Sequence, residues 1–274
     1  MSELKFHKME GAGNDFVVID NRKYGLSLDR IIDITPKLCD RKFGVGGDGI
    51  LVLQPAKRPD VDFTMIYRNA DGSDAGMCGN GARCLVQYAH EFGFNATQTF
   101  SVHDNIYEAE VHSDGSVSVH FPVHVQPKKR TLNEIEFIQA DAATEHLITF
   151  CGSEDLEDEK ELVKTGSAIR YHKDVNPPGS NVNFVHAEEE EIISLQTYER
   201  GVEDLTLACG TGALAAAIAT HFNQQSGRKH ATFTVRVKGG TLKASFDFNA
   251  GTNTYHQLIL TGPAHFVFEG IYKI

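Results

Sequence analysis

The sequence predicts an α/β (α+β) chain of two pseudo-symmetric halves, each a curved, mostly antiparallel sheet wrapped around a central helix. Strand-like patterns outnumber helical ones along the 274 residues. Two helical stretches each follow the same motif, Cys-Gly-x-Gly-Ala, whose cysteines are residues 78 and 209, 131 positions apart. A repeat at close to half the chain length indicates two similar structural units.

The strands are predicted from alternating or short apolar runs. Leu4–Met9 and Val61–Arg68 alternate between apolar and polar residues, and Asp15–Asp20 is a short apolar run. Tyr107–Val111 and Ser116–Phe121 flank Asp114-Gly115 as a hairpin. Further strands are expected near residues 146–151, 181–186, 191–198, 231–237, 241–248 and 256–261.

The helical patterns are fewer. One runs from Cys78 to a stop at Gly93, and its counterpart follows Cys209 through Ala213–Phe222. The second is apolar nearly all round, so we expect it to be buried between layers of sheet. A third, over residues 154–164, is charged and should be solvated.

The halves should meet near Phe121–Arg130, where Pro122, Pro127 and three consecutive basic residues interrupt the strand pattern. This boundary assigns residues 1–122 to an N-terminal half and 123–262 to a C-terminal half.

Composition excludes several classes of partner. The formal charge of −11 argues against nucleic acid and anionic membranes, because both favour a basic surface. No apolar run has the length of a membrane span, and the N-terminal residues do not resemble a signal peptide, so we expect a cytoplasmic protein. Five scattered cysteines do not form a disulfide framework, and no Cys-x2-Cys or His-x3-His pair suggests a metal site.

The paired motif carries the chemistry. Each places a cysteine, Cys78 or Cys209, just before a glycine-rich helix start. The unpaired N–H groups and the dipole at a helix start stabilise a thiolate. The bare glycine backbone also lets a substrate carboxylate approach the same N–H groups. One helix start can therefore activate a sulfur and hold an anion.

Two such starts suggest inversion of a stereocentre. One cysteine, as thiolate, would remove an α-proton, and the other, as thiol, would deliver a proton to the opposite face. The positive helix ends would stabilise the developing negative charge, so no cofactor is expected. Cys39, Cys84 and Cys151 lack the motif and are assigned to packing.

The motifs resemble those of the diaminopimelate epimerase family. Asn69–Cys84 and Tyr198–Ala213 are similar to its two active-site motifs, and Lys8–Val18 resembles its opening signature. Gly44–Gly49 and Gly179–Phe184 also fit, so the resemblance covers essentially the whole chain. It implies interconversion of LL- and meso-diaminopimelate in the bacterial route to lysine and peptidoglycan, an active site in the cleft between the halves, and a last strand near 263–274 that returns to the N-terminal half.

The resemblance also implies roles for single residues. Cys78 and Cys209 match the acid/base pair, and the substrate-binding positions match Asn14, Asn69, Gly79, Asn80, Asn181, Glu199, Arg200, Gly210 and Thr211. Arg200 can grip the distal carboxylate of a two-ended amino acid, and asparagines can donate to a carboxylate and accept from an ammonium. Family members are often dimers, so a homodimer is one expectation.

One segment departs from the family pattern. The usual Gly-Asn-Pro-His is replaced by Ala143-Thr-Glu-His146. His146 fits the histidine position and Thr144 the asparagine position, with a shorter reach. Glu145 adds a carboxylate whose direction the sequence leaves open.

Two alternatives remain at this point. A related racemase acting on proline or hydroxyproline would share the cysteines and differ in the residues that bind substrate. A thiol redox protein would also use two activated cysteines, although such proteins usually keep them close in sequence, as in Cys-x-x-Cys.

Overall fold

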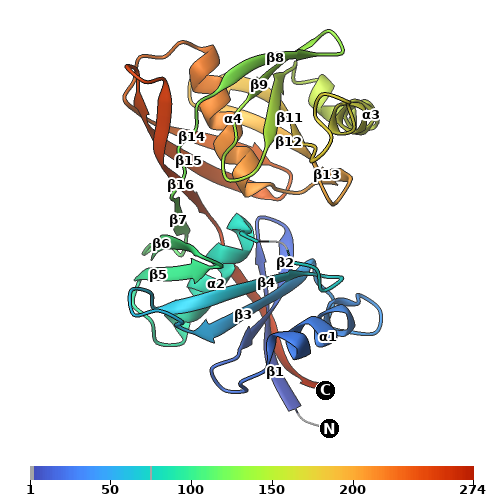
Figure 1. Cartoon of the computed structure of the whole chain (residues 1–274), viewed down its shortest axis with the longest axis vertical. Helices are drawn as coiled ribbons and strands as arrows, with labels where there is room; N and C mark the ends of the chain where they lie inside the picture. Colours follow the sequence, from blue (N-terminus) through green and yellow to red (C-terminus); the bar gives the residue numbers. More distant parts are fainter. Residues whose placement is uncertain (1–2, 75) are drawn as a thin grey trace. The chain divides into compact units, whose positions relative to one another are not determined.

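A computed structural model describes residues 3–74 and 76–274 of the chain. The chain divides into two compact units (Figure 1). Unit 1 comprises Met1–Val119 and Gly262–Ile274, and unit 2 comprises His120–Thr261. No helix in the described part of the chain has the length and apolar character needed to cross a membrane.

Unit 1 is a sheet with two helices. Its helices are α1 (Leu28–Cys39) and α2 (Gly79–Glu91). Its strands are β1 (Glu3–Gly11), β2 (Asn14–Asp20), β3 (Gly49–Pro55), β4 (Phe63–Asn69), β5 (Thr97–Val102), β6 (Asn105–Val111) and β17 (His265–Lys273), and β7 (Val117–Phe121) spans the unit boundary. The last strand, β17, pairs antiparallel with the first, β1.

Unit 2 is likewise a sheet with two helices. Its helices are α3 (Glu159–Arg170) and α4 (Gly210–Asn223), with a single 3-10 turn at Asp155–Glu157. Its strands are β8 (Lys128–Leu132), β9 (Ile135–Gln139), β10 (His146–Phe150), β11 (Asn181–Glu189), β12 (Ile192–Glu199), β13 (Asp204–Thr206), β14 (His230–Val237), β15 (Gly240–Asn249) and β16 (Thr254–Gly262).

The two units share one topology. In unit 1, β2 is parallel to β3, β3 is antiparallel to β4, β4 is parallel to β5, and β5 is antiparallel to β6. In unit 2, β10, β11, β12, β14 and β15 repeat the same sequence of directions. Each parallel pair is joined through a helix, as parallel strands require. The predicted duplication is therefore confirmed, although parallel pairs accompany the antiparallel ones.

A central helix packs against the sheet of each unit. Helix α2 packs against β1, β2, β3, β4 and β6, and α4 packs against β10, β11, β12, β14 and β15. Residues 210–221 of α4 are all buried, as its apolar sequence predicts. Both central helices were predicted from their apolar periodicity, and both begin one residue after a cysteine.

Helix α1 and strands β3, β5, β8, β9 and β13 were not predicted. Ser27 caps α1, and Ile31, Ile34 and Leu38 form its buried face. Pro36 lies inside the helix, and a proline normally indicates that a helix has ended, so the apolar periodicity was not interpreted as helical. The charged helix expected at residues 154–164 was placed too early: residues 155–157 form the 3-10 turn and α3 begins at Glu159. Asp158 caps α3 by accepting from the Glu161 N–H at 3.2 Å, which fixes the later start.

Candidate active site

Cys78 occupies the N-cap position of α2. Its backbone is extended (φ −116°), and its Sγ accepts a hydrogen bond from the Gly81 N–H at 3.4 Å. A backbone donor at a helix start stabilises negative charge on the sulfur. A Cβ on Gly81 would lie 2.9 Å from Leu51 Cδ2, so glycine is what lets this helix start pack against β3.

Asn14 and Asn80 meet beside this helix start. Ala12 and Gly13 have positive φ values of 56° and 93°, so β1 and β2 are joined by a tight two-residue turn that places Asn14 at the start of β2. Asn80 Nδ2 donates to Asn14 Oδ1. The fully buried Arg83 donates to Asn80 Oδ1 at 2.9 Å, which fixes the direction of the Asn80 amide.

Asn69 lies at the end of β4. Its Oδ1 accepts from Tyr67 OH at 3.2 Å, and its Nδ2 donates to Ser73 Oγ at 3.0 Å. Both bonds stay within its own strand and turn. The structure therefore joins Asn14 and Asn80 through a side-chain hydrogen bond, while Asn69 is held by Tyr67 and Ser73 at the strand end.

Cys209 occupies the N-cap position of α4, with a backbone (φ −115°) that closely matches that of Cys78. Its Sγ lies 3.7 Å from Thr211 Oγ1, whose side chain is in the first turn of the helix. A Cβ on Gly212 would lie 2.7 Å from Asn183 Oδ1, so only glycine leaves room for this asparagine against α4.

A buried hydrogen-bond network leads to Cys209. His146 Nε2 lies 2.9 Å from the hydroxyl of Thr211 and 2.9 Å from that of Thr144, and the two hydroxyls are 3.2 Å apart. His146 Nδ1 lies 3.1 Å from Asn183 Nδ2, and Asn183 Oδ1 accepts from Thr197 at 2.9 Å. His146 and Asn183 are fully buried.

The network assigns the position of one proton. Asn183 Oδ1 accepts from Thr197, and Asn183 Nδ2 also donates to Leu147 O at 3.2 Å, so this amide presents its N–H to His146. Nδ1 of His146 is therefore the acceptor and Nε2 carries the hydrogen. When Nε2 donates to Thr211, the Thr211 hydroxyl is left to donate toward Cys209 Sγ.

His146 is neutral over the working range of pH. Burial lowers its pKa to about 3, the charge of Arg200 acts in the same direction, and the bond with Asn183 opposes them only in part. His146 Nε2 contacts the hydroxyls of Thr211 and Thr144. It orients the hydroxyls around Cys209 and does not serve as a cationic acid.

Asn181, Arg200 and Glu145 form the next layer of the site. Asn181 Nδ2 donates to Glu145 O at 3.1 Å and to Thr144 Oγ1 at 3.4 Å, and Asn181 Oδ1 accepts from the Arg200 N–H at 2.9 Å. Arg200 Nη1 donates to Gly179 O at 3.0 Å and pairs with Glu145 Oε2 at 2.8 Å. Glu199 ends β12, immediately before Arg200.

The shared topology explains why these residues gather. Asn14 and His146 begin the equivalent strands β2 and β10, and Asn69 and Glu199 end the equivalent strands β4 and β12. Asn181 begins β11. In each unit, the polar side chains therefore come from the same edge of the sheet as the central helix start.

Three residues of this arrangement were missed in the sequence. Arg83 buttresses Asn80, while Asn183 and Thr197 fix His146. The available signal was the spacing Asn181-Val-Asn183, which puts two amides on one face of an otherwise apolar strand. Arg83 follows Cys78 by five positions inside the first motif, where a charged residue in a buried helix needs a local partner.

The other cysteines lie in the packed interior or beside it. Burial raises the pKa of Cys39 to about 12, that of Cys151 to about 11, and that of Cys84 further. Burial therefore favours the neutral thiol at all three positions. Among the residues that the structure describes, no three His, Cys, Asp or Glu side chains are placed to hold a metal ion.

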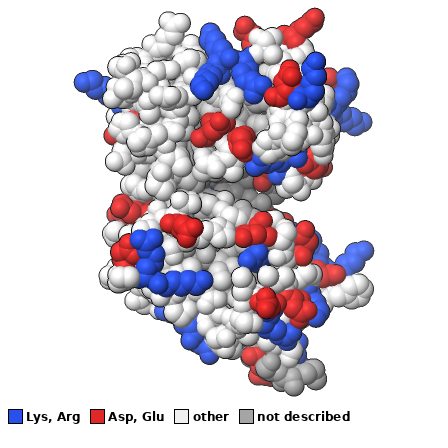
Figure 2. Space-filling view, viewed as in Figure 1, with Lys and Arg blue, Asp and Glu red and all other residues white. Residues whose placement is uncertain are grey.

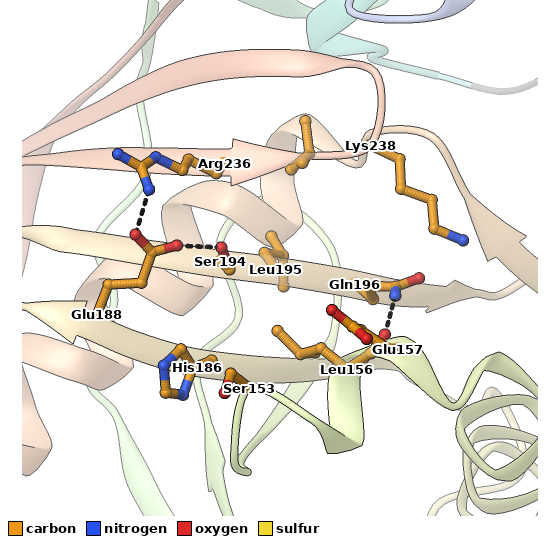
Figure 3. Close-up of a pocket in the computed structure, with 11 residues that line it drawn as sticks. Ser153, Leu156, Glu157, His186, Glu188, Ser194, Leu195, Gln196, Arg236 and Lys238 are labelled. Atoms are coloured by element: carbon orange, nitrogen blue, oxygen red, sulfur yellow. Dashed lines mark hydrogen bonds and ion pairs between the residues drawn. The ribbon is translucent and has the colours of Figure 1, made fainter.

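A separate pocket of about 390 Å³ lies on unit 2 (Figure 3). Its polar lining is largely paired internally: Glu188 bonds to Arg236 and Ser194, and Gln196 donates to Leu156 O. None of the residues predicted from the sequence is in its lining. Acidic and basic side chains are also interspersed on the face of each unit seen in Figure 2, as in an ordinary solvated surface.

Solved structures with the same fold identify a class of proteins. The chain is similar to a crystal structure of a phenazine biosynthesis protein of the PhzF family from Bacillus anthracis, with a TM-score of 0.78, 12% identity and complete coverage of both chains. It is also similar to a hydroxyproline epimerase from Agrobacterium vitis, with a TM-score of 0.72, 14% identity, and coverage of 98% of this chain and 92% of that one. These likenesses place the chain in the class of two-unit proteins that share this fold.

Sequence comparison narrows the class to one family. The family model described as diaminopimelate epimerase matches residues 6–122 and 139–267. The diaminopimelate epimerase of Flavobacterium psychrophilum is 35% identical over 97% of this chain and 99% of its own length, and that of Aquifex aeolicus is 36% identical over 97% of each. The chain belongs to the diaminopimelate epimerase family and is an isomerase.

Proposed function

We propose that this chain interconverts LL-2,6-diaminopimelate and meso-diaminopimelate by moving one α-proton between two cysteines. The observation that carries the proposal is the matched pair of N-cap cysteines, Cys78 and Cys209, in a chain of this family. The Gly81 N–H donates to the sulfur of Cys78, and the Thr211 hydroxyl lies 3.7 Å from the sulfur of Cys209.

The proposed step balances without a cofactor. The thiolate of one cysteine takes the α-proton, so a Cα–H bond breaks, an S–H bond forms and the electron pair passes into the substrate carboxylate. The second cysteine then gives its proton to the opposite face and becomes the thiolate. Helix-start N–H groups, including those of Gly79, Asn80, Gly210 and Thr211, would stabilise the charge on the carboxylate.

Most of the remaining predicted residues would bind the unreactive end. Asn14, Asn69, Asn181 and Arg200 supply amide and guanidinium groups for it, whereas Glu199 would supply a carboxylate near the reacting centre. Thr144 and His146 would support this set through the network that holds Thr211. A site with this many polar groups would reject an amino acid that lacks the second end, because those groups would be left unpaired.

Exchange in heavy water tests the proposal. The wild-type chain should place deuterium at Cα of diaminopimelate with no added cofactor and should invert the centre. Cys78→Ala and Cys209→Ala should each abolish inversion, whereas Cys151→Ala, outside the motif, should retain it. Faster turnover of L-proline than of diaminopimelate, or full inversion by Cys209→Ala, would contradict the proposal.

Compartment and partners are part of the same proposal. A reaction that alternates a thiol and a thiolate needs a reducing compartment such as the cytoplasm. The partner is a small molecule, and the net charge of −11 disfavours nucleic acid and anionic membranes.

A homodimer is proposed through β17, where Phe266, Val267, Phe268 and Ile271 are exposed. Sedimentation of the wild type against Ile271→Lys tests this, and a monomeric wild type would contradict it.

A further inference from the structure

The segment that departs from the family pattern places a carboxylate on the substrate-binding arginine. Glu145 Oε2 lies 2.8 Å from Arg200 Nη1. The glutamate is 44% exposed and the arginine 27% exposed, so both charges remain accessible. The sequence gives no direction for Glu145, and the structure points it at the group expected to grip a carboxylate.

This pair belongs to the same connected set as Cys209. Asn181 accepts from the Arg200 N–H and donates to Thr144, and Thr144 lies 3.2 Å from Thr211 Oγ1. Thr211 is the hydroxyl next to Cys209 Sγ. The backbone of Arg200 is therefore linked to Cys209 through the side chains of Asn181, Thr144 and Thr211.

Glu145, but not Arg200, also lines open space. Glu145 and Gly179, the two partners of the Arg200 guanidinium, both line a pocket of about 270 Å³. A group entering beside Glu145 would meet a carboxylate whose other face is held by Arg200. The backbone of Glu145 is fixed as well, since its carbonyl accepts from Asn181 Nδ2 at 3.1 Å.

The charges define what the pair can recognise. Arg200 alone would bind any terminal carboxylate, because a guanidinium has no acceptor atom that could bind a neighbouring ammonium. Arg200 together with Glu145 presents a positive and a negative group side by side. That arrangement is complementary to a zwitterion, in which a carboxylate and an ammonium share one carbon.

We propose that Glu145 is a specificity residue which accepts the ammonium of the substrate's unreactive end while Arg200 binds the carboxylate of that end. The inference rests on the proposed function, since it assigns a contact to the distal amino-acid group of diaminopimelate. Thr144 provides only a hydroxyl where the family commonly has an asparagine, and Glu145 supplies a charged acceptor one residue away. In this chain, the carboxylate of Glu145 would therefore select for substrates that carry an amino-acid group at each end.

The test compares two ligands in two variants. 2-Aminopimelate has the same carbon chain and both carboxylates but lacks the distal ammonium. Glu145→Gln should raise KM for diaminopimelate about tenfold, as expected for loss of a charge-assisted hydrogen bond at an accessible site. The inhibition constant of 2-aminopimelate should stay within about twofold or fall, because Arg200 loses its internal partner. Glu136→Gln, an exposed glutamate of β9, is the matched control and should change neither constant.

Each outcome has one meaning. If Glu145→Gln weakens both ligands equally, or if KM for diaminopimelate falls, Glu145 does not read the ammonium and the inference is wrong. Glu145→Asp should restore part of the discrimination, which a purely structural role would not require. If the wild-type chain does not epimerise diaminopimelate, the proposed function fails as well. If the wild type is active and Glu145→Gln discriminates between diaminopimelate and 2-aminopimelate as the wild type does, the inference alone fails.

Discussion

Thr211→Val removes one hydroxyl from the network around Cys209 and keeps the shape of the side chain. The hydroxyl lies 2.9 Å from His146 Nε2 and 3.7 Å from Cys209 Sγ. His146 keeps Thr144 Oγ1 at 2.9 Å as a partner, so no buried donor is orphaned. We therefore expect the free energy of unfolding to fall by only about 1 kcal/mol, the net value of one neutral hydrogen bond.

The effect on reaction rate should be larger. If the hydroxyl donates to a thiolate, its loss removes a charge-assisted bond that contributes about 1.5 kcal/mol, at the low end of the usual range because the contact is long. That free energy corresponds to about a tenfold decrease in kcat. The assay is deuterium incorporation at Cα of diaminopimelate under saturating substrate, together with urea unfolding of the same preparations.

Thr211→Ser is the matched control. It restores the hydroxyl and removes the methyl group, so kcat should stay within about threefold of the wild type while stability falls by about 1 kcal/mol. A serine variant as slow as the valine variant, or a valine variant with wild-type kcat, would refute the assignment of the Thr211 hydroxyl as a donor to Cys209.

Three further predictions concern the surroundings of the same helix start. Burial lowers the pKa of His146 from 6.5 to about 3, so between these pH values only the unfolded chain takes up this proton, and the free energy of unfolding falls as the pH decreases. His146→Gln should reduce the slope of the free energy of unfolding against pH, measured between pH 6 and 4, by up to about 1.4 kcal/mol per pH unit. An unchanged slope would contradict the lowered pKa. Asn183→Leu removes the partner of His146 Nδ1, of Leu147 O and of the Thr197 hydroxyl, and it should lower the free energy of unfolding by about 3 kcal/mol in urea titrations. A loss below about 1 kcal/mol would show that these groups find other partners. Gly212→Ala puts a Cβ 2.7 Å from the Asn183 amide and 3.2 Å from Cys209 Sγ, so both the melting temperature and kcat should decrease, despite the better helix propensity of alanine; a more stable and fully active variant would show that the asparagine moves aside freely.

The features that the sequence predicted are local ones. The helices that follow Cys78 and Cys209 could be read because a cysteine, two glycines and an apolar run lie within a dozen residues of one another. Duplication could be read because the same short motif occurs twice. Helix α1 could not, since Pro36 within it is normally a sign of a helix end.

The features that escaped prediction depend on contacts between distant positions. Asn183 reaches His146 across 37 residues, and Arg200, which directly follows β12, reaches Glu145. Parallel pairing of β10 with β11 brings His146 opposite Asn181, and this register is not contained in either segment alone. Periodicity reports which face of a strand is buried, but it does not report which strand lies beside it.

The pairing of β17 with β1 sets an order of assembly during synthesis. Unit 2 is one uninterrupted stretch, so all its strands are synthesised before β17. The first strand of unit 1 must wait for His265–Lys273, with which it shares a ladder from Glu3 to Glu10. The half made first on the ribosome is therefore the half completed last, and a chain truncated before β17 would leave β1 with an open edge able to pair with other molecules.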